Sequence, residues 1–433
     1  MLRVSDNQRY LVRSDGTPFL YLGDTCWELF HRTTREEADL YLENRARLKF
    51  TVIQAVVLAE PDGLRAPNSY GDLPLRDMDP SRPNDRYFRH VDYVMDRAAR
   101  HGLFVGLLPT WGDKVGPKYW GVGPKIFTVE NARAFGRFLG RRYRDSPIIW
   151  ILGGDRPANT EPVRNIWRVM AEGLKEGDGG RHLMTYHPGG WRSCSHYWPP
   201  DEPWLDFHMI QSGHQAKNRP NYRLVEDDYG RVPVKPTFDG EPRYEHHPVA
   251  FKKGNPRFDD YDVRQAAYWG LLAGGCGHTY GCHEVWQLWT PTRRPVTFAD
   301  LPWQRALELP GAQQMQHVRA LYEARDFLKL QPDQGLIVSG QGRGQHHVQA
   351  ARAHDGSFAF VYLPTGRPVG IALEKVGGSH VLAHWFDSRT GTWQLIRRFR
   401  ARGTRAFTPP TSGRGNDWVL VLDAEPSGNG QQT

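Results

Sequence analysis

Residues 148–155 read Ile148-Ile149-Trp150-Ile151-Leu152-Gly153-Gly154-Asp155, and they carry the clearest structural signal in the chain. A run of bulky apolar residues without polar alternation is typical of a strand that is buried on both faces, as in a parallel sheet covered by helices. The two glycines let the backbone turn sharply and leave space beside it for a ligand. This stretch therefore predicts a buried parallel strand that delivers a carboxylate at its end.

Similar β-rich runs alternate with helical patterns from about residue 19 to residue 330. We predict eight strands, at Phe19–Asp24, Thr51–Leu58, Leu103–Pro109, Ile148–Gly153, Leu183–His187, Asp206–Gln211, Pro236–Gly240 and Gly277–Gly281. Helical patterns lie between them, at Thr34–Arg47 (with a capping box), Asp85–Arg100, Val129–Tyr143, Val163–Leu174 and Asp259–Ala273. Eight strands interleaved with helices predict an α/β fold, the closed (β/α)8 TIM barrel.

The pattern changes beyond Leu330, where short strands are separated by Gly, Pro, Asp and Ser turns. We predict strands at Gln334–Gly340, His347–Ala351, Ser357–Leu363, Gly370–Leu373, Ala383–Asp387, Thr392–Arg398 and Trp418–Asp423. Such spacing indicates a small antiparallel β-sandwich. The expected division is a barrel domain over residues 1–330, a sandwich accessory domain over 331–426 and a disordered tail over 427–433.

Composition excludes several classes of protein. Charged residues make up 24% of the chain and hydrophobic residues 39%, as in a globular protein. No stretch approaches the ~18 apolar residues of a membrane span, so we expect no membrane partner. No signal peptide is visible at the start, which predicts a cytoplasmic protein, or a secreted or periplasmic one if a signal has been removed. The four cysteines form no CxxC pair and are expected to be reduced, buried thiols.

The net charge of +8 raises the question of an anionic partner. Its densest run is Arg397-Arg398-Phe399-Arg400-Ala401-Arg402, which lies in a strand-like context where arginines commonly face solvent. No nucleic-acid-binding signature accompanies it, so we expect no nucleic-acid partner. A nucleic-acid-binding protein would instead require salt-dependent DNA binding in the Arg397–Arg405 region. An acidic polysaccharide would explain the charge equally well.

Aromatic residues are abundant, with 15 Trp, 18 Tyr and 19 Phe. Several lie beside Gly, Pro and His in expected loops, as in Trp111-Gly112-Asp113, His196-Tyr197-Trp198-Pro199-Pro200 and Trp286-Gln287-Leu288-Trp289. Core packing explains aromatic residues within strands better than those in polar loops. Stacking against an amphipathic ligand such as a sugar is a natural use for the latter.

The strand ends supply candidate catalytic groups, because chemistry in such a barrel sits at the carboxyl ends of its strands. Asp155 ends the fourth strand and Glu241 follows the seventh, so the two are expected to face each other across the barrel mouth. Taken alone, Asp155 could equally cap the next helix. As a pair, the carboxyl groups match what retaining glycoside hydrolysis requires, a proton donor and a nucleophile. Glu60 and Glu245 are lesser carboxylate candidates.

Other residues near the strand ends are expected to bind the substrate. Asp24 would contact a sugar hydroxyl, orient a neighbouring group or cap a helix. His187 and His283 would hold the nucleophile or sugar hydroxyls unless they are structural. The predicted substrate-binding residues are Asp24, Trp27, Gln54, Trp111, His187, Gln211, His283 and Trp286. His278, Cys282 and His283 raise the question of a metal, but strand geometry points neighbours to opposite sides. We expect no metal and no cofactor.

Three motifs together resemble a known family. Gly23-Asp24-Thr25-Cys26-Trp27-Glu28-Leu29, Gly153-Gly154-Asp155 and Asp239-Gly240-Glu241-Pro242-Arg243-Tyr244-Glu245 resemble the apiosidase-like catalytic domain of glycoside hydrolase family 140. The β-rich remainder resembles the small domain, named as collagen-binding, that follows it there, so the resemblance covers nearly the whole chain. Related barrel hydrolases usually carry Asn-Glu at strand four, whereas Gly-Asp here follows the apiosidase-like pattern.

The resemblance implies roles for both carboxyl groups. It makes Asp155 the acid/base and Glu241 the nucleophile of a retaining attack on a furanoside, with apiose in pectin side chains as the known case. The expected function is therefore a retaining glycosidase, apiosidase-like or arabinofuranosidase-like, with a furanose-containing glycan or glycoside as its carbohydrate substrate. The alternative is a catalytically silent carbohydrate-binding barrel. Neither interpretation defines the oligomeric state.

Overall fold

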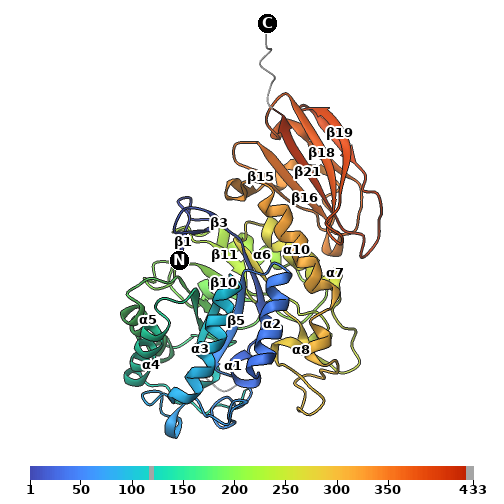
Figure 1. Cartoon of the computed structure of the whole chain (residues 1–433). Helices are drawn as coiled ribbons and strands as arrows, with labels where there is room; N and C mark the ends of the chain where they lie inside the picture. Colours follow the sequence, from blue (N-terminus) through green and yellow to red (C-terminus); the bar gives the residue numbers. More distant parts are fainter. Residues whose placement is uncertain (117–120, 426–433) are drawn as a thin grey trace.

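The computed structural model describes residues 1–116 and 121–425 and shows a barrel with a smaller β-domain attached (Figure 1). The predicted tail, residues 427–433, lies outside the described residues. All eight predicted barrel strands are present. They are β4 (Tyr21–Thr25), β5 (Val52–Leu58), β6 (Phe104–Thr110), β7 (Ile148–Gly153), β8 (Met184–His187), β10 (His208–Gln211), β11 (Thr237–Asp239) and β12 (Gly277–Tyr280).

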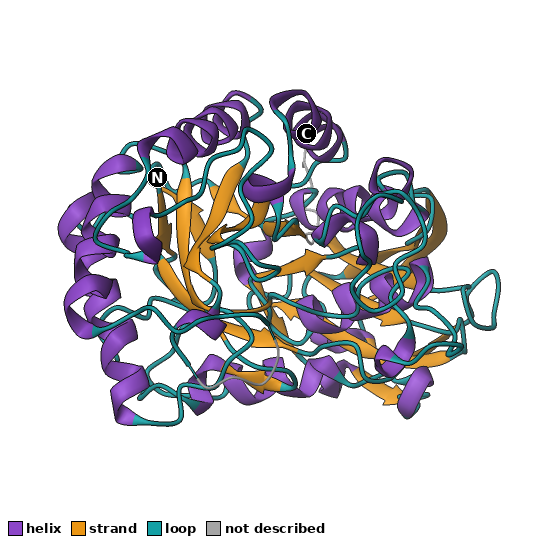
Figure 2. Ribbon diagram, turned by 90° about the horizontal axis from the view of Figure 1, so that it is seen from below, coloured by secondary structure: helices purple, strands orange, loops and turns teal. Residues whose placement is uncertain are grey.

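These strands form one curled parallel sheet with the order β8-β7-β6-β5-β4-β12-β11-β10, and a short strand β9 (Arg192–Ser193) joins β10 antiparallel. The backbone N–H of Asp206, just before β10, donates to the carbonyl of Met184 in β8 at 2.9 Å, which brings the two ends of the sheet together. Helices surround this ring of strands (Figure 2). The (β/α)8 prediction is confirmed.

The helices lie where the periodicity places them, with additions. The longer ones are α2 (Arg35–Arg47), α3 (Asp85–Arg100), α4 (Val129–Arg142), α5 (Glu161–Asp178), α6 (Asn221–Tyr229), α7 (Asp260–Leu272) and α10 (Pro310–Glu323). Single-turn α-helices are α1 (Leu29–Arg32), α8 (His283–Trp286) and α9 (Trp303–Ala306). The predicted capping box opens α2, since Thr34 Oγ1 accepts from the Glu37 N–H at 3.3 Å and the Glu37 side chain accepts in return. The helical patterns did not predict α6 or α10.

Short 3₁₀ segments fill several connections. They are Arg76–Met78, Gly112–Lys114, Cys194–His196, Val249–Phe251, Phe327–Lys329, Gln334–Leu336, Gly344–His346 and Leu373–Lys375. At the start of the chain an unpredicted antiparallel meander, β1 (Leu2–Val4), β2 (Leu11–Arg13) and β3 (Pro18–Phe19), precedes the barrel. Among the described residues, no helix is both long enough and apolar enough to span a membrane.

The accessory domain contains two antiparallel sheets, as predicted. The six-stranded sheet has the order β13 (Leu330–Pro332), β15 (Gln349–Ala353), β16 (Phe358–Leu363), β21 (Trp418–Glu425), β18 (His380–Asp387) and β19 (Trp393–Arg400). The smaller sheet contains β14 (Ile337–Ser339), β17 (Val369–Ala372) and β20 (Thr404–Phe407). Strands β13 and β20 were not predicted. An apolar cluster that includes Val361, Ile371 and Leu420 fills the space between the sheets.

The other face of the six-stranded sheet packs on the barrel. Phe358, Phe360 and Tyr362 in β16 belong to the same apolar cluster as the barrel core, and the Tyr362 ring stacks on Tyr268 of α7 with centroids 4.8 Å apart. A buried ion pair joins Arg264 of α7 to Asp417 at 2.7 Å. The accessory domain is thus bound to α7 and its neighbours, on the outside of the barrel.

Candidate active site

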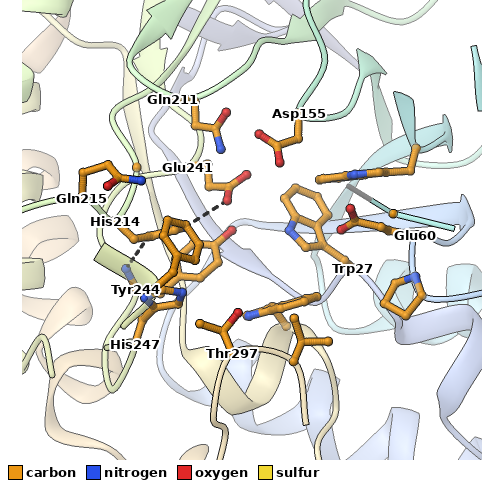
Figure 3. A pocket seen from close by; sticks show the side chains of 18 of the residues that line it. Trp27, Glu60, Asp155, Gln211, His214, Gln215, Glu241, Tyr244, His247 and Thr297 are labelled. Atoms are coloured by element: carbon orange, nitrogen blue, oxygen red, sulfur yellow. Dashed lines mark hydrogen bonds and ion pairs between the residues drawn. The ribbon is translucent and has the colours of Figure 1, made fainter. Parts of the chain in front are cut away.

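A cavity of about 760 Å³ lies at the barrel mouth, where the loops after the strands converge (Figure 3). Asp155 and Glu241 both face it, so the two predicted catalytic carboxyl groups share one pocket. Its lining residues are Trp27, Glu60, Pro61, Trp111, Gly121, Val122, Asp155, Gly190, Trp191, Gln211, Gly213, His214, Gln215, Arg219, Glu241, Tyr244, His247, Phe251, Trp286, Val296 and Thr297.

Asp155 reaches the pocket through an unusual turn after β7. Gly153, Gly154 and Asp155 have φ angles of 86°, 115° and 58°, a left-handed run that two glycines make accessible. A Cβ on Gly153 would lie 2.4 Å from the carbonyl oxygen of His187, so a larger residue does not fit there. Helix α5 begins later, at Glu161 with Thr160 as its N-cap residue, so Asp155 does not cap this helix.

The environment of Asp155 suits a proton donor. Burial raises its pKa to about 7, and the negative charge of Glu241 adds to this effect, while His187, Arg156 and a side-chain hydrogen bond with Gln211 act in the opposite direction. A carboxylic acid with such a pKa keeps its proton in mildly acidic solution and can give it to a leaving oxygen.

Glu241 follows β11 and is held at both of its oxygens. Its Oε2 lies 2.7 Å from Nε2 of His187, and its Oε1 accepts from Nε2 of His214 at 3.1 Å. Burial alone would raise the pKa of Glu241, but these two contacts outweigh it and lower the pKa to about 2. Glu241 is therefore ionised under the conditions in which Asp155 is protonated, as a nucleophile must be.

The two histidines are fixed so that their Nε2 atoms point at Glu241. Nδ1 of His214 accepts from the backbone N–H of Tyr244 at 3.4 Å, which leaves the proton of a neutral imidazole on Nε2, where it is donated to the carboxylate. Nδ1 of His187 lies 3.0 Å from the carbonyl oxygen of Pro188 and 3.2 Å from the backbone N of Asp155. Burial lowers the pKa of His187, but the contact with Glu241 outweighs it and raises the pKa, which favours an imidazolium that pairs with the carboxylate.

His214 was missed by the sequence reasoning. It lies three residues after the end of β10, and its ring packs against Tyr244 at 4.4 Å and against His247 at 4.5 Å between centroids. Its place in Gln211-Ser212-Gly213-His214, directly after a predicted strand, was the available signal.

Three of the predicted sugar-stacking residues line the cavity, namely Trp27, Trp111 and Trp286. The rings of Trp27 and Trp111 lie 5.1 Å apart. Trp191 adds a fourth indole, with the guanidinium of Arg219 3.7 Å from its ring centroid. Gln211, also predicted, lies beside Asp155 (Figure 3).

Asp24 and Gln54 do not line the cavity. Asp24 faces helix α2 outside the ring of strands, where its Oδ2 accepts from the Tyr41 hydroxyl at 2.5 Å and from Nε of Arg45 at 2.8 Å. Gln54 lies inside the barrel below the mouth, and its amide donates to the carbonyl of Gly240 at 3.0 Å. The structure thus places Asp24 and Gln54 in supporting positions.

His187 and His283 are buried behind the residues that line the cavity. His187 contacts Glu241, the residue that the sequence analysis expects it to hold. His283 binds the carbonyl of Thr297 through Nε2 at 2.8 Å and packs against His247 at 4.5 Å. Glu245 is also buried away from the cavity, where it accepts from the Tyr280 hydroxyl at 2.5 Å.

Glu60 is the third carboxyl group in the cavity. Its side chain is 15% exposed and lies 3.9 Å from Nη2 of Arg156, while Arg156 Nη1 lies 3.9 Å from Asp155 Oδ2. Within residues 1–116 and 121–425, Glu60 Oε1 has no hydrogen-bond partner although it is shielded from solvent. Burial raises the pKa of Glu60 to about 8, and the charge of Asp155 contributes, so Glu60 is a neutral acid at pH 7.

One group among the described residues brings several possible metal ligands together, namely His246, Glu284 and Asp300. His246 Nδ1 lies 2.8 Å from Glu284 Oε1, and Arg257 contributes a guanidinium 2.7 Å from Asp300. The arginine supplies the positive charge that a cation would bring, so this group is an ion-pair network. All four cysteines are unpaired and buried, as predicted.

Comparison with known proteins gives two family matches. The model described as apiosidase-like, catalytic domain, matches residues 5–329, and the one described as "Putative collagen-binding domain of a collagenase" matches residues 331–423. The comparison with curated proteins returned no match.

Solved structures are similar over the whole chain. One described as a glycoside hydrolase is 33% identical with a TM-score of 0.89, covering 98% of this chain and 97% of its own. A glycoside hydrolase family 5 protein from Bacteroides vulgatus ATCC 8482 is 31% identical with a TM-score of 0.90, covering 98% and 93%. A family 5 mannosidase from Rhizomucor miehei, 13% identical with a TM-score of 0.51 over 74% and 97%, shares the fold alone.

Proposed function

Because this chain belongs to the apiosidase-like family and is a glycoside hydrolase, we propose that it cleaves furanosides with retention of configuration, using Asp155 and Glu241. The observation that carries the proposal is the opposite ionisation of two carboxyl groups in one pocket. Burial and a neighbouring negative charge keep Asp155 protonated, while two histidines keep Glu241 charged. Retaining hydrolysis requires this division between acid and nucleophile.

In the first step of the proposed reaction, Glu241 attacks the anomeric carbon and the bond from that carbon to the leaving oxygen breaks. Asp155 gives its proton to the departing oxygen, so the aglycone leaves as an alcohol. In the second step, Asp155 takes a proton from water, the resulting hydroxyl group bonds to the anomeric carbon, and Glu241 leaves as a carboxylate. Both groups return to their starting states.

The substrate assignment rests on the resemblance to glycoside hydrolase family 140 and on the shape of the pocket. A cavity of about 760 Å³ lined by four indole rings suits the stacking of sugar rings. Glu60, a neutral acid with an unpartnered oxygen, would bind a sugar hydroxyl beside Asp155. These features support an apiosidase-like or arabinofuranosidase-like activity.

A panel of aryl furanosides and aryl pyranosides, each in both anomeric forms, tests this proposal. We expect turnover of at least one furanoside by the wild-type protein and none by the matched variant Glu241→Gln, which controls for contaminating hydrolases. Hydrolysis of pyranosides alone would contradict the furanoside assignment. Equal activity in both proteins would contradict the role of Glu241.

A further inference from the structure

The accessory domain carries an arginine-rich surface that the barrel chemistry does not use. Residues 388–416 contain seven arginines and no Asp or Glu. Four of them form what we call the arginine edge, namely Arg397, Arg400, Arg402 and Arg405, and all four are exposed. None has a carboxylate within ion-pair distance in residues 1–116 and 121–425, and residues 117–120 and 426–433 contain no Asp or Glu.

The fold brings the strands that carry these residues together, with Arg397 and Arg400 on opposite faces of β19. Strand β19 is an edge strand of the six-stranded sheet, and β20 is an edge strand of the three-stranded sheet. The short turn between β19 and β20 carries Arg402, so the open edges of both sheets meet on one side of the sandwich. Figure 1 shows β19 at the outer edge of the domain, far from α1 and α8 beside the catalytic pocket.

Two of the guanidinium groups are held in place by an aromatic ring. Arg397 from β19 and Arg405 from β20 lie 5.0 Å and 4.7 Å from the centroid of the Phe399 ring. This contact reduces the freedom of both side chains before any ligand binds and leaves their N–H groups available. By contrast, the adjacent Arg398 is paired with Glu425 and is not part of the arginine edge.

We propose that the arginine edge binds an anionic polysaccharide whose sugars carry carboxylate groups, and so attaches the hydrolase to its surroundings. A guanidinium group binds a planar carboxylate through two parallel hydrogen bonds, and a row of such groups matches the repeated charges of a polyuronate. This inference rests on membership of a glycoside hydrolase family and not on the furanoside assignment.

Binding to polygalacturonate tests the proposal, with the same polymer fully methyl-esterified as the neutral comparison. We expect the full-length protein to bind the acidic polymer at low salt, to lose this binding as salt rises, and to ignore the ester. The variant R397Q/R400Q/R402Q/R405Q should bind about tenfold more weakly or worse. The control variant R100Q/R141Q removes charge from exposed arginines on α3 and α4 and should bind nearly as the wild type does.

A second variant keeps the test valid if the first one is unstable. R397K/R405K retains both charges but removes the paired guanidinium donors, so it should bind the acidic polymer several fold more weakly than the wild type while the melting temperature stays unchanged. Unaltered binding by the quadruple glutamine variant would overturn the proposal, and so would equal binding of the methyl ester. Tighter binding of duplex DNA or of collagen than of polygalacturonate would assign the surface to another class of partner. Cleavage of a small neutral glycoside that the wild type hydrolyses should be the same in all these variants.

Discussion

The hydrogen bonding of buried carboxylate and amide oxygens differs between Asp417, at the interface between the two domains, and the barrel mouth. At the interface, Asp417 accepts from Arg264 at 2.7 Å and 3.1 Å and from the hydroxyl groups of Ser388 and Tyr362 at 2.7 Å and 3.1 Å. At the mouth, Glu60 Oε1 and Gln211 Oε1 have no partner among the described residues. A satisfied network stabilises a structure, whereas shielded but unpartnered oxygens facing a cavity remain available to a ligand.

The largest effect is expected from Glu241→Gln. The amide cannot attack an anomeric carbon, so kcat should fall by about 1,000-fold or more on a natural glycan. Because glutamine has the same shape, the melting temperature should stay close to that of the wild type. Retention of more than a few per cent of the rate would remove Glu241 from the mechanism.

Asp155→Asn should slow hydrolysis of an unactivated substrate by about 100- to 10,000-fold, since general acid catalysis supplies a factor of that size. An aryl glycoside with a good leaving group should lose less in the first step. In the wild type, activity should fall as pH rises through about 7, because Asp155 then loses the proton that it must donate. If the activity of the Asn variant fell with rising pH in the same way, a group other than Asp155 would cause that fall.

At the interface, Arg264→Met should weaken the fold rather than the chemistry. It leaves Asp417 buried without its cation, and the free energy of unfolding should fall by about 3–5 kcal/mol. Well below the melting temperature, kcat on a small glycoside should not change. Replacing both partners, as in R264M/D417N, should recover part of the lost stability. If Arg264→Met lowered kcat without lowering the free energy of unfolding, the accessory domain would contribute to catalysis.

His214→Phe separates ring packing from the hydrogen bond to Glu241. The phenyl ring can still stack on Tyr244 and His247, but Glu241 loses the donor to Oε1. The pKa of Glu241 should rise, so the acidic limb of the activity profile should move to higher pH by about one unit. His214→Asn, which keeps a donor, should move it less. Equal shifts in the two variants would show that the hydrogen bond is not the cause.

The smallest effect is expected from Glu60→Gln, which resembles the neutral acid and should change KM by only a few fold. Glu60→Ala should raise KM by about tenfold with a smaller change in kcat, because a hydrogen bond to the sugar is lost. These two variants at the mouth should change KM and leave the free energy of unfolding unchanged. Arg264→Met at the interface should do the opposite. No change in KM for either variant would exclude Glu60 from substrate binding.

The sequence predicted the barrel well because buried parallel strands have an apolar signature of their own. All eight strands were found, but α6 was not, because Asn221–Tyr229 begins after a proline and offers no side-chain N-cap. Strand β20, Thr404–Phe407, was missed because three of its four residues are exposed and show no alternation. Local pattern therefore predicts an element best where that element is buried.

The candidate site shows a related limit. Asp155 and Glu241 could be found because glycines precede both at predicted strand ends. Asp24 lies within β4, and a difference of one residue in the strand end decides whether a side chain faces the mouth or a helix. The roles of His214 and Arg156 depend on contacts between loops that are distant in sequence, and these require the folded chain.

Trapping of a covalent intermediate tests the central claim most directly. The protein would be incubated with a 2-deoxy-2-fluoro furanoside bearing a good leaving group, digested and analysed by mass spectrometry. We predict one fluorosugar per chain, attached to the peptide that contains Glu241, with no labelling of Glu241→Gln. Attachment to Asp155 or Glu60, or hydrolysis that releases the inverted anomer without any labelling, would contradict the account.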